Sequence, residues 1–504
     1  MPNMSRPKLA CKVRCLVATC LVLVATWVVF SASPAFAKDV RITLVQANDV
    51  YEMTPVNGSR YGGFARLQTL VKQLRAENPN TYTILAGDLL SPSAIGNAKV
   101  DGERLHGKQM VDVLNVMGWN FMTLGNHEFD NGRDSLIARL SEAKFKIVSS
   151  NVIDTATGIP FPHTERTALI EVDGVRIGLG GITLQSLSRD FVTVLAPFTE
   201  ARAVLAELKS GDSADIVILL THQAIDDDVL LAERLPGIAL IVGGHEHINY
   251  YRRRGPDFTP IAKADSNART VYIQDLTYDT ETRALNVESR LQIVDSSFNE
   301  DPEIAKRVDF WVEKTFAALR ADGFRPDAVI AKTDVPLDGL ESSVRFKATR
   351  LTDLIAQSAV RAFPGSQLSL VNAGGIRIDD VLPAGDITQY DIVRILPFGG
   401  DYVEVEMPGD ILRRALDIGQ KNKGIGSFLI HANISSADGG WRIGDRPLSD
   451  QTVYRLAIAA FLVDQGDTGL EFLVNNPKIK RISPKGVDTR FALIDELSAQ
   501  YPPR

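Results

Sequence analysis

The chain has 504 residues, of which 45% are hydrophobic and 23% are charged, so it is long enough for two or three domains with cores of their own. The formal net charge of −7 argues against broad nucleic-acid binding, which needs a basic surface. All three cysteines lie within the first 20 residues, so no disulfide can cross-link the rest of the chain.

The first residues have the pattern of a secretory signal. Four cations come first: Arg6, Lys8, Lys12 and Arg14. An uncharged apolar run follows over residues 16–30, shorter than the ~20 residues of a membrane helix. Ala35 and Ala37 then form a small-x-small cleavage site. We predict a cleaved signal peptide over residues 1–37 and no stable membrane anchor; an uncleaved anchor is the alternative.

The mature chain predicted in this way contains no cysteine, although export would place it where disulfides can form. Its formal charge, without the four cations of the leader, would be −11. A cysteine-free exported protein of this size is typical of a bacterial periplasm, so we predict a secreted, periplasmic protein.

From about residue 40 to residue 295, short β-rich runs alternate with amphipathic segments. Leu67, Leu70, Val71 and Leu74 recur at helical spacing in a predicted helix over 64–74, and residues 105–117 form another. Asp173-Gly174 between two valines predicts a hairpin, because Asp-Gly accepts the positive φ of a two-residue turn. Alternation of this kind predicts an α/β fold with a layered sheet.

One long helix is predicted over residues 302–319, with an apolar face that includes Ile304, Val308 and Trp311. We interpret it as a connector between domains, although it could be an ordinary surface helix. The alternating pattern restarts at Asp327 and continues to about residue 493. The predicted division is a signal peptide (1–37), a first domain (38–298), a connector helix (299–326) and a second domain (327–504).

Five apolar runs of the first domain each end in residues of metal-ligating type. The residues are Asp49, Asp88, Asn126 with His127, His222, and His245 with His247. In an open α/β sheet, sites form outside the carboxyl ends of the strands, so these side chains should gather there. Four of the chain's seven histidines fall in these blocks, which chance placement would rarely achieve.

These blocks, above all Gly125-Asn126-His127-Glu128 with Gly244-His245-Glu246-His247 behind it, resemble the calcineurin-like metallophosphoesterases. The whole mature chain resembles the secreted 5'-nucleotidases. The resemblance implies a four-layer αββα domain, joined by a helix to a smaller α/β substrate domain. It also implies two divalent metal ions, such as manganese or zinc, which suit phosphate-ester hydrolysis.

By resemblance, Asp88 bridges the two metals. The first metal would also take Asn126, His222 and His245, and the second would also take Asp49 and His247. The family's first block is Asp-x-His, whereas this chain has Tyr51 in place of the histidine. Tyr51 could ligate as a phenolate, which suits iron, or Glu52 or water could fill the position instead.

His127 and Asp130 are the predicted catalytic pair. In the family the histidine stabilises charge on the transferring phosphoryl group, and Asp130 would hold the imidazole in one tautomer. The alternative is that Asp130 only caps a helix that begins near Gly132.

The C-terminal half carries the predicted substrate residues. Asn372, Gly374 and Arg377 match the family's Asn-x-Gly-Gly-Ile-Arg block, and Arg345 with Arg377 would grip phosphate. Phe428 and Phe461 would clamp a nucleobase, and Asp467 would bind the ribose. Core packing is the alternative for both phenylalanines. Ala348, Arg350 and Gln465 depart from the family pattern.

The predicted function is metal-dependent hydrolysis of nucleoside 5'-monophosphates to nucleoside and phosphate. Nucleotide sugars, 2',3'-cyclic nucleotides and sulfur-chain esters are alternative substrates. A non-catalytic ligand-binding protein with a degraded metal site is the alternative of another class. The predicted partner is a small nucleotide and not a nucleic acid, and the oligomeric state stays open.

Overall fold

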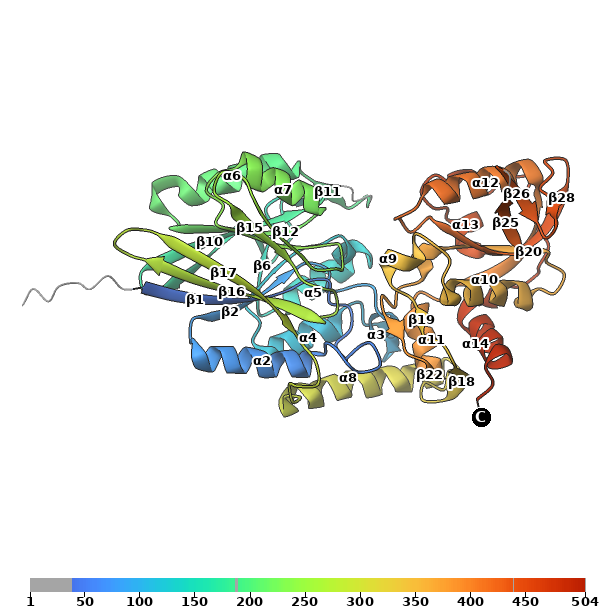
Figure 1. Ribbon diagram of the computed structural model, residues 1–504, viewed down its shortest axis with the longest axis horizontal. Helices are drawn as coiled ribbons and strands as arrows, with labels where there is room; N and C mark the ends of the chain where they lie inside the picture. Colours follow the sequence, from blue (N-terminus) through green and yellow to red (C-terminus); the bar gives the residue numbers. More distant parts are fainter. Residues whose placement is uncertain (1–38, 186–188, 438, 504) are drawn as a thin grey trace, which may run out of the picture.

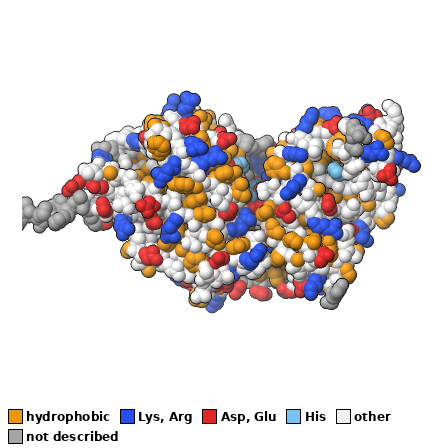
Figure 2. Space-filling view, in the orientation of Figure 1, with side chains coloured by type: hydrophobic (Ala, Val, Ile, Leu, Met, Phe, Trp, Pro, Cys, Tyr) orange, Lys and Arg blue, Asp and Glu red, His pale blue; other side chains and the backbone are white. Residues whose placement is uncertain are grey.

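The computed structural model describes residues 39–185, 189–437 and 439–503, so the predicted signal peptide lies outside the described residues. The described chain forms an N-terminal lobe (β1 to β17) and a C-terminal lobe (β18 to α14), and helix α8 (Pro302–Ala321) runs along the N-terminal lobe to the C-terminal lobe (Figure 1). Figure 2 shows the surface indented between the two lobes. Within the described part of the chain, no helix combines the length and apolarity that crossing a membrane requires.

The first sheet of the N-terminal lobe has seven strands in the order β17-β16-β1-β2-β5-β6-β8. Their bounds are β1 Asp39–Ala47, β2 Thr81–Ala86, β5 Phe121–Thr123, β6 Lys146–Val148, β8 Thr164–Glu165, β16 Thr270–Asp279 and β17 Leu285–Ile293. Strands β1, β2, β5 and β6 are parallel neighbours, so their carboxyl ends lie along one edge of the sheet.

The second sheet has six strands in the order β14-β15-β13-β12-β10-β9. Their bounds are β9 Thr167–Val172, β10 Val175–Thr183, β12 Ile216–His222, β13 Leu240–Gly244, β14 Tyr250–Arg254 and β15 Thr259–Lys263. Strands β10, β12 and β13 are parallel. The predicted hairpin is confirmed: Val172 pairs with Val175, and Asp173 (φ 50°) and Gly174 (φ 83°) make the turn.

Helices cover the outer faces of both sheets, which confirms the predicted αββα layers. The helices are α2 Phe64–Glu77, α4 Lys108–Met117, α5 Arg133–Glu142, α6 Pro197–Lys209 and α7 Ile225–Arg234. Leu44, Ile84 and Ile218 belong to the core between the sheets. Val71 and Leu114 pack with the outer face of the first sheet, and α6 and α7 pack on the second. Helix α4 begins later than predicted, because Gly107 is left-handed (φ 83°).

The C-terminal lobe is a smaller α/β unit around a sheet in the order β24-β20-β28-β23-β29, with β30 paired to β23. These strands are β20 Leu368–Asn372, β23 Asp401–Pro408, β24 Leu429–Ala432, β28 Val453–Ala459, β29 Lys480–Arg481 and β30 Val487–Asp488. Its main helices are α10 Arg350–Ala362, α11 Gln389–Ile395, α12 Gly409–Lys421 and α14 Thr489–Gln500. Leu354, Leu370, Leu456 and Leu493 share its core.

Shorter elements complete both lobes. They are α3 Ala94–Asn97, β3 Lys99–Val100, β4 Glu103–Arg104, β7 Val152–Asp154, β11 Val192–Val194, β18 Val329–Thr333, β19 Leu337–Asp338, α9 Glu341–Val344, β21 Val381–Leu382, β22 Gly385–Thr388, β25 Ile434–Ala437, β26 Gly440–Ile443, β27 Arg446–Pro447 and α13 Ala460–Asp464. Helix α9 carries Glu341 toward the N-terminal lobe, where it meets His247. The domain boundaries drawn from the sequence remain a prediction.

Candidate active site

The polar residues after the parallel strands lie together at the carboxyl edge of the two sheets. Four of them have positive φ: Asp49 (53°), Asp88 (59°), His245 (100°) and His247 (62°). Left-handed backbone costs about 1–3 kcal/mol per non-glycine residue and concentrates at functional sites. These turns therefore point to a site that the fold maintains at a cost in stability.

Three ligand-type atoms in this cluster are buried without a hydrogen-bond partner. They are Asp49 Oδ1, Asn126 Oδ1 and His222 Nε2. Ligand atoms of Asp49, Asp88 and His222 lie within 4.8 Å of one another, with His222 Nε2 3.2 Å from Asp88 Oδ2. Buried polar atoms are rarely left without a partner, so their arrangement fits a bound divalent cation.

The orientation of His222 suits a metal ligand. Its Nδ1 lies 2.7 Å from Ala86 O and donates to that carbonyl, so Nε2 faces the carboxylates. Burial lowers the pKa of His222, but the charges of Asp88 and Asp49 outweigh it and raise the pKa to about 9. Burial and then the neighbouring His222 lower the pKa of His245 to about 3. The raised pKa of His222 reflects the negative charge of Asp88 and Asp49, which a cation would neutralise.

A second group of donors surrounds the hydroxyl of Tyr51, which is buried. This hydroxyl donates to Asp88 Oδ2 at 3.0 Å and lies 2.9 Å from His247 Nε2. His247 Nε2 is 3.5 Å from Asp49 Oδ1. Burial and then the charge of Asp88 raise the pKa of Tyr51 well above its ordinary value. Glu52 instead pairs with Arg394 of the C-terminal lobe at 3.7 Å, so it does not fill this position.

His127 and Asp130 form the contact expected from the sequence. His127 Nδ1 lies 2.7 Å from Asp130 Oδ2, and the backbone N–H of His127 donates to Asp88 Oδ1. Asp130 also accepts from Ser91 Oγ and Arg189 Nη2. The first turn of α5 has no side-chain cap, so the alternative capping role of Asp130 is not what the structure shows.

Two acidic residues support the site, the buried Glu128 and the half-buried Glu246, and the sequence alone assigned neither a role. Glu128 accepts backbone N–H groups of Asp88, Leu89, Leu90 and Gly125, which ties the turn after β2 to the turn after β5. Glu246 lies between the two histidines of the last block and accepts from Lys263 Nζ at 2.7 Å. Glu128 lies inside the Asn-His block, so its place in the sequence could have indicated its role. The role of Glu246 could not be recognised in this way, because its buried partner comes from another strand.

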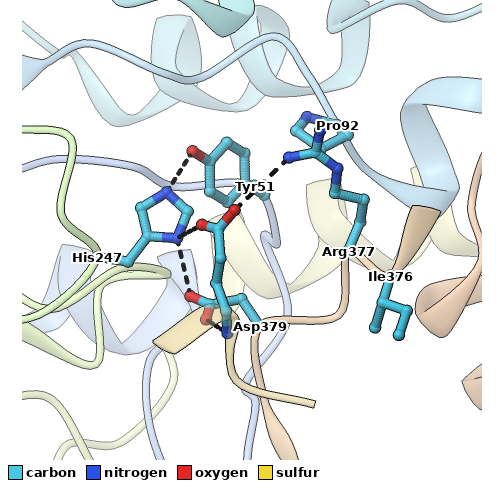
Figure 3. Close-up of a pocket in the computed structure, with 7 residues that line it drawn as sticks. Tyr51, Pro92, His247, Ile376, Arg377 and Asp379 are labelled. Atoms are coloured by element: carbon cyan, nitrogen blue, oxygen red, sulfur yellow. Dashed lines mark hydrogen bonds and ion pairs between the residues drawn. The ribbon is translucent and has the colours of Figure 1, made fainter. Parts of the chain in front are cut away.

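Arg377 of the C-terminal lobe lines a small pocket with Tyr51 and His247 across the boundary between the lobes (Figure 3). Arg345 lies near enough to Arg377 and Tyr51 to interact with their charges. Burial and then the neighbouring Arg377 lower the pKa of Arg345 to about 9. Glu341 pairs with Arg345, lies 3.9 Å from Arg377 Nη1, and places Oε2 3.0 Å from His247 Nδ1. A cavity of only about 10 Å³ remains here. Glu341 thus pairs with the two arginines that the sequence assigns to binding the substrate phosphate.

The predicted nucleoside residues are only partly brought together. Asn372 Nδ2 donates to Asp467 Oδ2 at 3.1 Å. A Cβ at Gly374 would lie 3.0 Å from Gly426 Cα, so this close approach of two backbones favours glycine. Phe428 is buried and lines a cavity of about 250 Å³ that Phe461 does not line. The clamp formed by the two phenylalanines therefore stays a prediction.

Comparisons with known proteins agree with the two lobes. Residues 42–249 match the calcineurin-like phosphoesterase family, and residues 329–474 match the 5'-nucleotidase C-terminal domain. A 5'-nucleotidase of Bos taurus is 26% identical and aligns with 92% of this chain and 90% of its own. A snake venom 5'-nucleotidase of Crotalus adamanteus is 24% identical, covering 89% of this chain and 85% of its own.

Solved structures share the fold. A 5'-nucleotidase precursor of Thermus thermophilus superimposes with a TM-score of 0.76 at 24% identity and covers 92% of this chain and 97% of its own. A sulfate thiohydrolase of the same organism has a TM-score of 0.69 at 15% identity, covering 92% and 95%. The arrangement of both lobes is therefore that of these proteins.

Proposed function

Because the chain belongs to the 5'-nucleotidase family, with a calcineurin-like phosphoesterase domain before a 5'-nucleotidase C-terminal domain, we propose that it hydrolyses nucleoside 5'-monophosphates to nucleoside and phosphate. One observation carries the proposal. Buried ligand atoms without partners, Asp49 Oδ1, Asn126 Oδ1 and His222 Nε2, lie in the lobe that faces the half-buried Arg345 and Arg377.

Two divalent cations complete the proposed site. The first would be held by Asp88, Asn126, His222 and His245, and the second by Asp49, Asp88, His247 and Tyr51. The donor separations around the second position, 2.9–3.5 Å, are those of neighbouring ligands on one cation. Such cations act as Lewis acids toward a phosphate ester and lower the pKa of water.

The side chains then have distinct tasks. His127, held by Asp130, would donate to the phosphoryl oxygens as charge builds on them. Arg345 and Arg377 would hold the substrate phosphate by bidentate hydrogen bonds once Glu341 leaves them. The remaining cavity of about 10 Å³ is far smaller than the ~300 Å³ of typical ligand pockets, so substrate entry would require the lobes to separate.

At the other end of the substrate, Asp467 with Asn372 would bind the ribose, and Phe428 and Phe461 would contact the base. The basic and apolar pattern of residues 1–37 supports activity outside the cytoplasm, in a bacterial periplasm. The identity of the cations would be manganese, zinc or iron, of which iron suits a phenolate ligand best.

A substrate panel tests the proposal. We expect AMP to be hydrolysed in Mn²⁺ or Zn²⁺ with a higher kcat/KM than UDP-glucose or 2',3'-cyclic AMP, measured by phosphate release and chromatography. Arg377→Ala should raise KM for AMP about 10–100-fold, because a hydrogen bond to a charged group contributes about 1.5–3 kcal/mol. Arg413→Ala, at a surface arginine of the same lobe, is the control. Folded protein that releases no product from AMP with any metal would refute the proposal.

A further inference from the structure

We propose that Asp379 is a positioning residue through which the C-terminal lobe holds His247, so that the second cation binds tightly only when the lobes are together. The proposal rests on the proposed function only in taking His247 as a metal ligand. It adds that the affinity for the second cation depends on the relative position of the two lobes.

His247 is held at both ring nitrogens, from opposite lobes. Its Nε2 faces Tyr51 and Asp49 within the N-terminal lobe. Its Nδ1 lies 3.1 Å from Asp379 Oδ2 of the C-terminal lobe (Figure 3). Metal-ligating histidines commonly donate their other ring N–H to a carboxylate, which fixes the tautomer and the ring orientation. Here that carboxylate reaches across the boundary between the lobes.

The carboxylate of Asp379 is itself fixed. Its Oδ2 accepts from Ser266 Oγ at 2.6 Å and lies 3.6 Å from Arg269 Nη2, both in the N-terminal lobe. Its Oδ1 accepts the backbone N–H of Glu341 at 2.9 Å. The residue is buried and its backbone is left-handed (φ 37°). These contacts aim one oxygen at His247 and leave little freedom to turn away.

Glu341 also reaches His247 Nδ1, at 3.0 Å, but it is a less constant partner. It is shared with Arg345 and Arg377, the groups proposed to take the substrate phosphate. Once a phosphate displaces it, Asp379 is the carboxylate that still holds the ring. Ser266 and Arg269, which hold Asp379 from the N-terminal lobe, have no proposed role in binding substrate.

The first metal position is supported differently. His222 donates its Nδ1–H to Ala86 O, a carbonyl of its own lobe, and this contact survives any movement of the C-terminal lobe. Removal of the Asp379 carboxylate should therefore affect metal binding at the two positions differently. The first cation should stay bound, while the second should dissociate more readily.

The neighbouring Asp380 offers a matched control. It lies in the same boundary between the lobes, accepts the backbone N–H of Asn57 at 2.9 and 3.0 Å, and pairs with Arg394 at 3.1 Å. The contact with Asn57 joins the lobes, the pair with Arg394 lies within the C-terminal lobe, and neither involves His247. A loss of second-site binding that follows Asp379 but not Asp380 would identify the contact with His247 as the cause, rather than a general loosening of the lobes.

The experiment uses full-length protein freed of metal and equilibrated with defined free Mn²⁺. Elemental analysis gives the number of bound ions, and electron paramagnetic resonance shows the coupled signal of a manganese pair. Wild type and Asp380→Asn should bind two ions. Asp379→Ala should keep one and bind the second about 10–100-fold more weakly, without the coupled signal, as expected for loss of a partner of a metal ligand.

Asp379→Asn keeps an oxygen acceptor, so its affinity for the second ion should lie between those of wild type and Asp379→Ala. This variant tests the proposal if Asp379→Ala does not fold. The proposal is overturned if either Asp379 variant binds the second ion as wild type does, if Asp380→Asn loses it equally, or if wild type binds one ion only. AMP hydrolysis by wild type, measured separately, shows whether the proposed function itself stands.

Discussion

His127 shows how a single side chain is prepared for its task by its neighbours. Its backbone N–H donates to Asp88 Oδ1, so its position is tied to the proposed bridging ligand. Its Nδ1 is held by Asp130, which Ser91 and Arg189 hold in turn. The imidazole is thus anchored outside the set of proposed metal ligands. This arrangement fits the proposed role of His127 toward the substrate rather than as a metal ligand.

We expect His127→Ala to lower kcat for AMP about 10²–10³-fold, the range seen when one donor to a developing oxyanion is removed. Metal content, measured by elemental analysis, should not change. His163→Ala, at an exposed histidine of the same lobe, is the control and should retain normal kcat. Near-normal turnover of the His127 variant would remove this residue from the mechanism.

The turns after the parallel strands are the elements that hold the proposed ligands. Asp88 and Gly125 lie in two of these turns, and both donate their backbone N–H groups to Glu128. Glycine is required at position 125 for lack of space, since a Cβ there would lie 2.2 Å from Asp88 Oδ1 and 2.8 Å from Asp88 N. The close approach of the two turns fixes the carboxylate that would bridge the cations.

Gly125→Ala should therefore displace Asp88, weaken Mn²⁺ binding at both positions at least about tenfold, and lower the free energy of unfolding by about 1–3 kcal/mol through overpacking. Metal titration and denaturant unfolding measure the two effects. The control is Gly440→Ala in β26, where an added Cβ meets no atom within 4 Å. Unchanged metal affinity of the Gly125 variant would show that this turn does not set the position of Asp88.

These elements also show what the sequence could and could not predict. Asp49, Asp88 and His222 follow apolar runs in the chain, so strand periodicity and the carboxyl-edge rule were enough to bring them together. Tyr51 was recognised as a departure, but its contacts with Asp88 and His247 needed coordinates. Whether Phe428 and Phe461 share a binding site depends on the packing of α13 and β24, which no local pattern encodes.

For the whole molecule, the sequence predicted two α/β units and a connecting helix, because both alternating patterns and the face of residues 302–319 are local features. It did not predict how the lobes meet. Asp379 and Glu341 lie more than 90 residues from His247 in the chain, and nothing in their own segments indicates contact with a metal ligand. Contacts between lobes depend on surface complementarity, which a single sequence does not reveal.

The central claim is that this lobe arrangement assembles a metal-dependent phosphoesterase. The most direct test is phosphate release from AMP by chelator-treated protein during titration with Mn²⁺, with Asp88→Asn as the control variant. We predict no turnover after chelation, recovery that saturates at about two equivalents, the number of cations in a dinuclear site, and none in the variant. Turnover that chelation leaves unchanged, or that no divalent metal restores, would contradict the account.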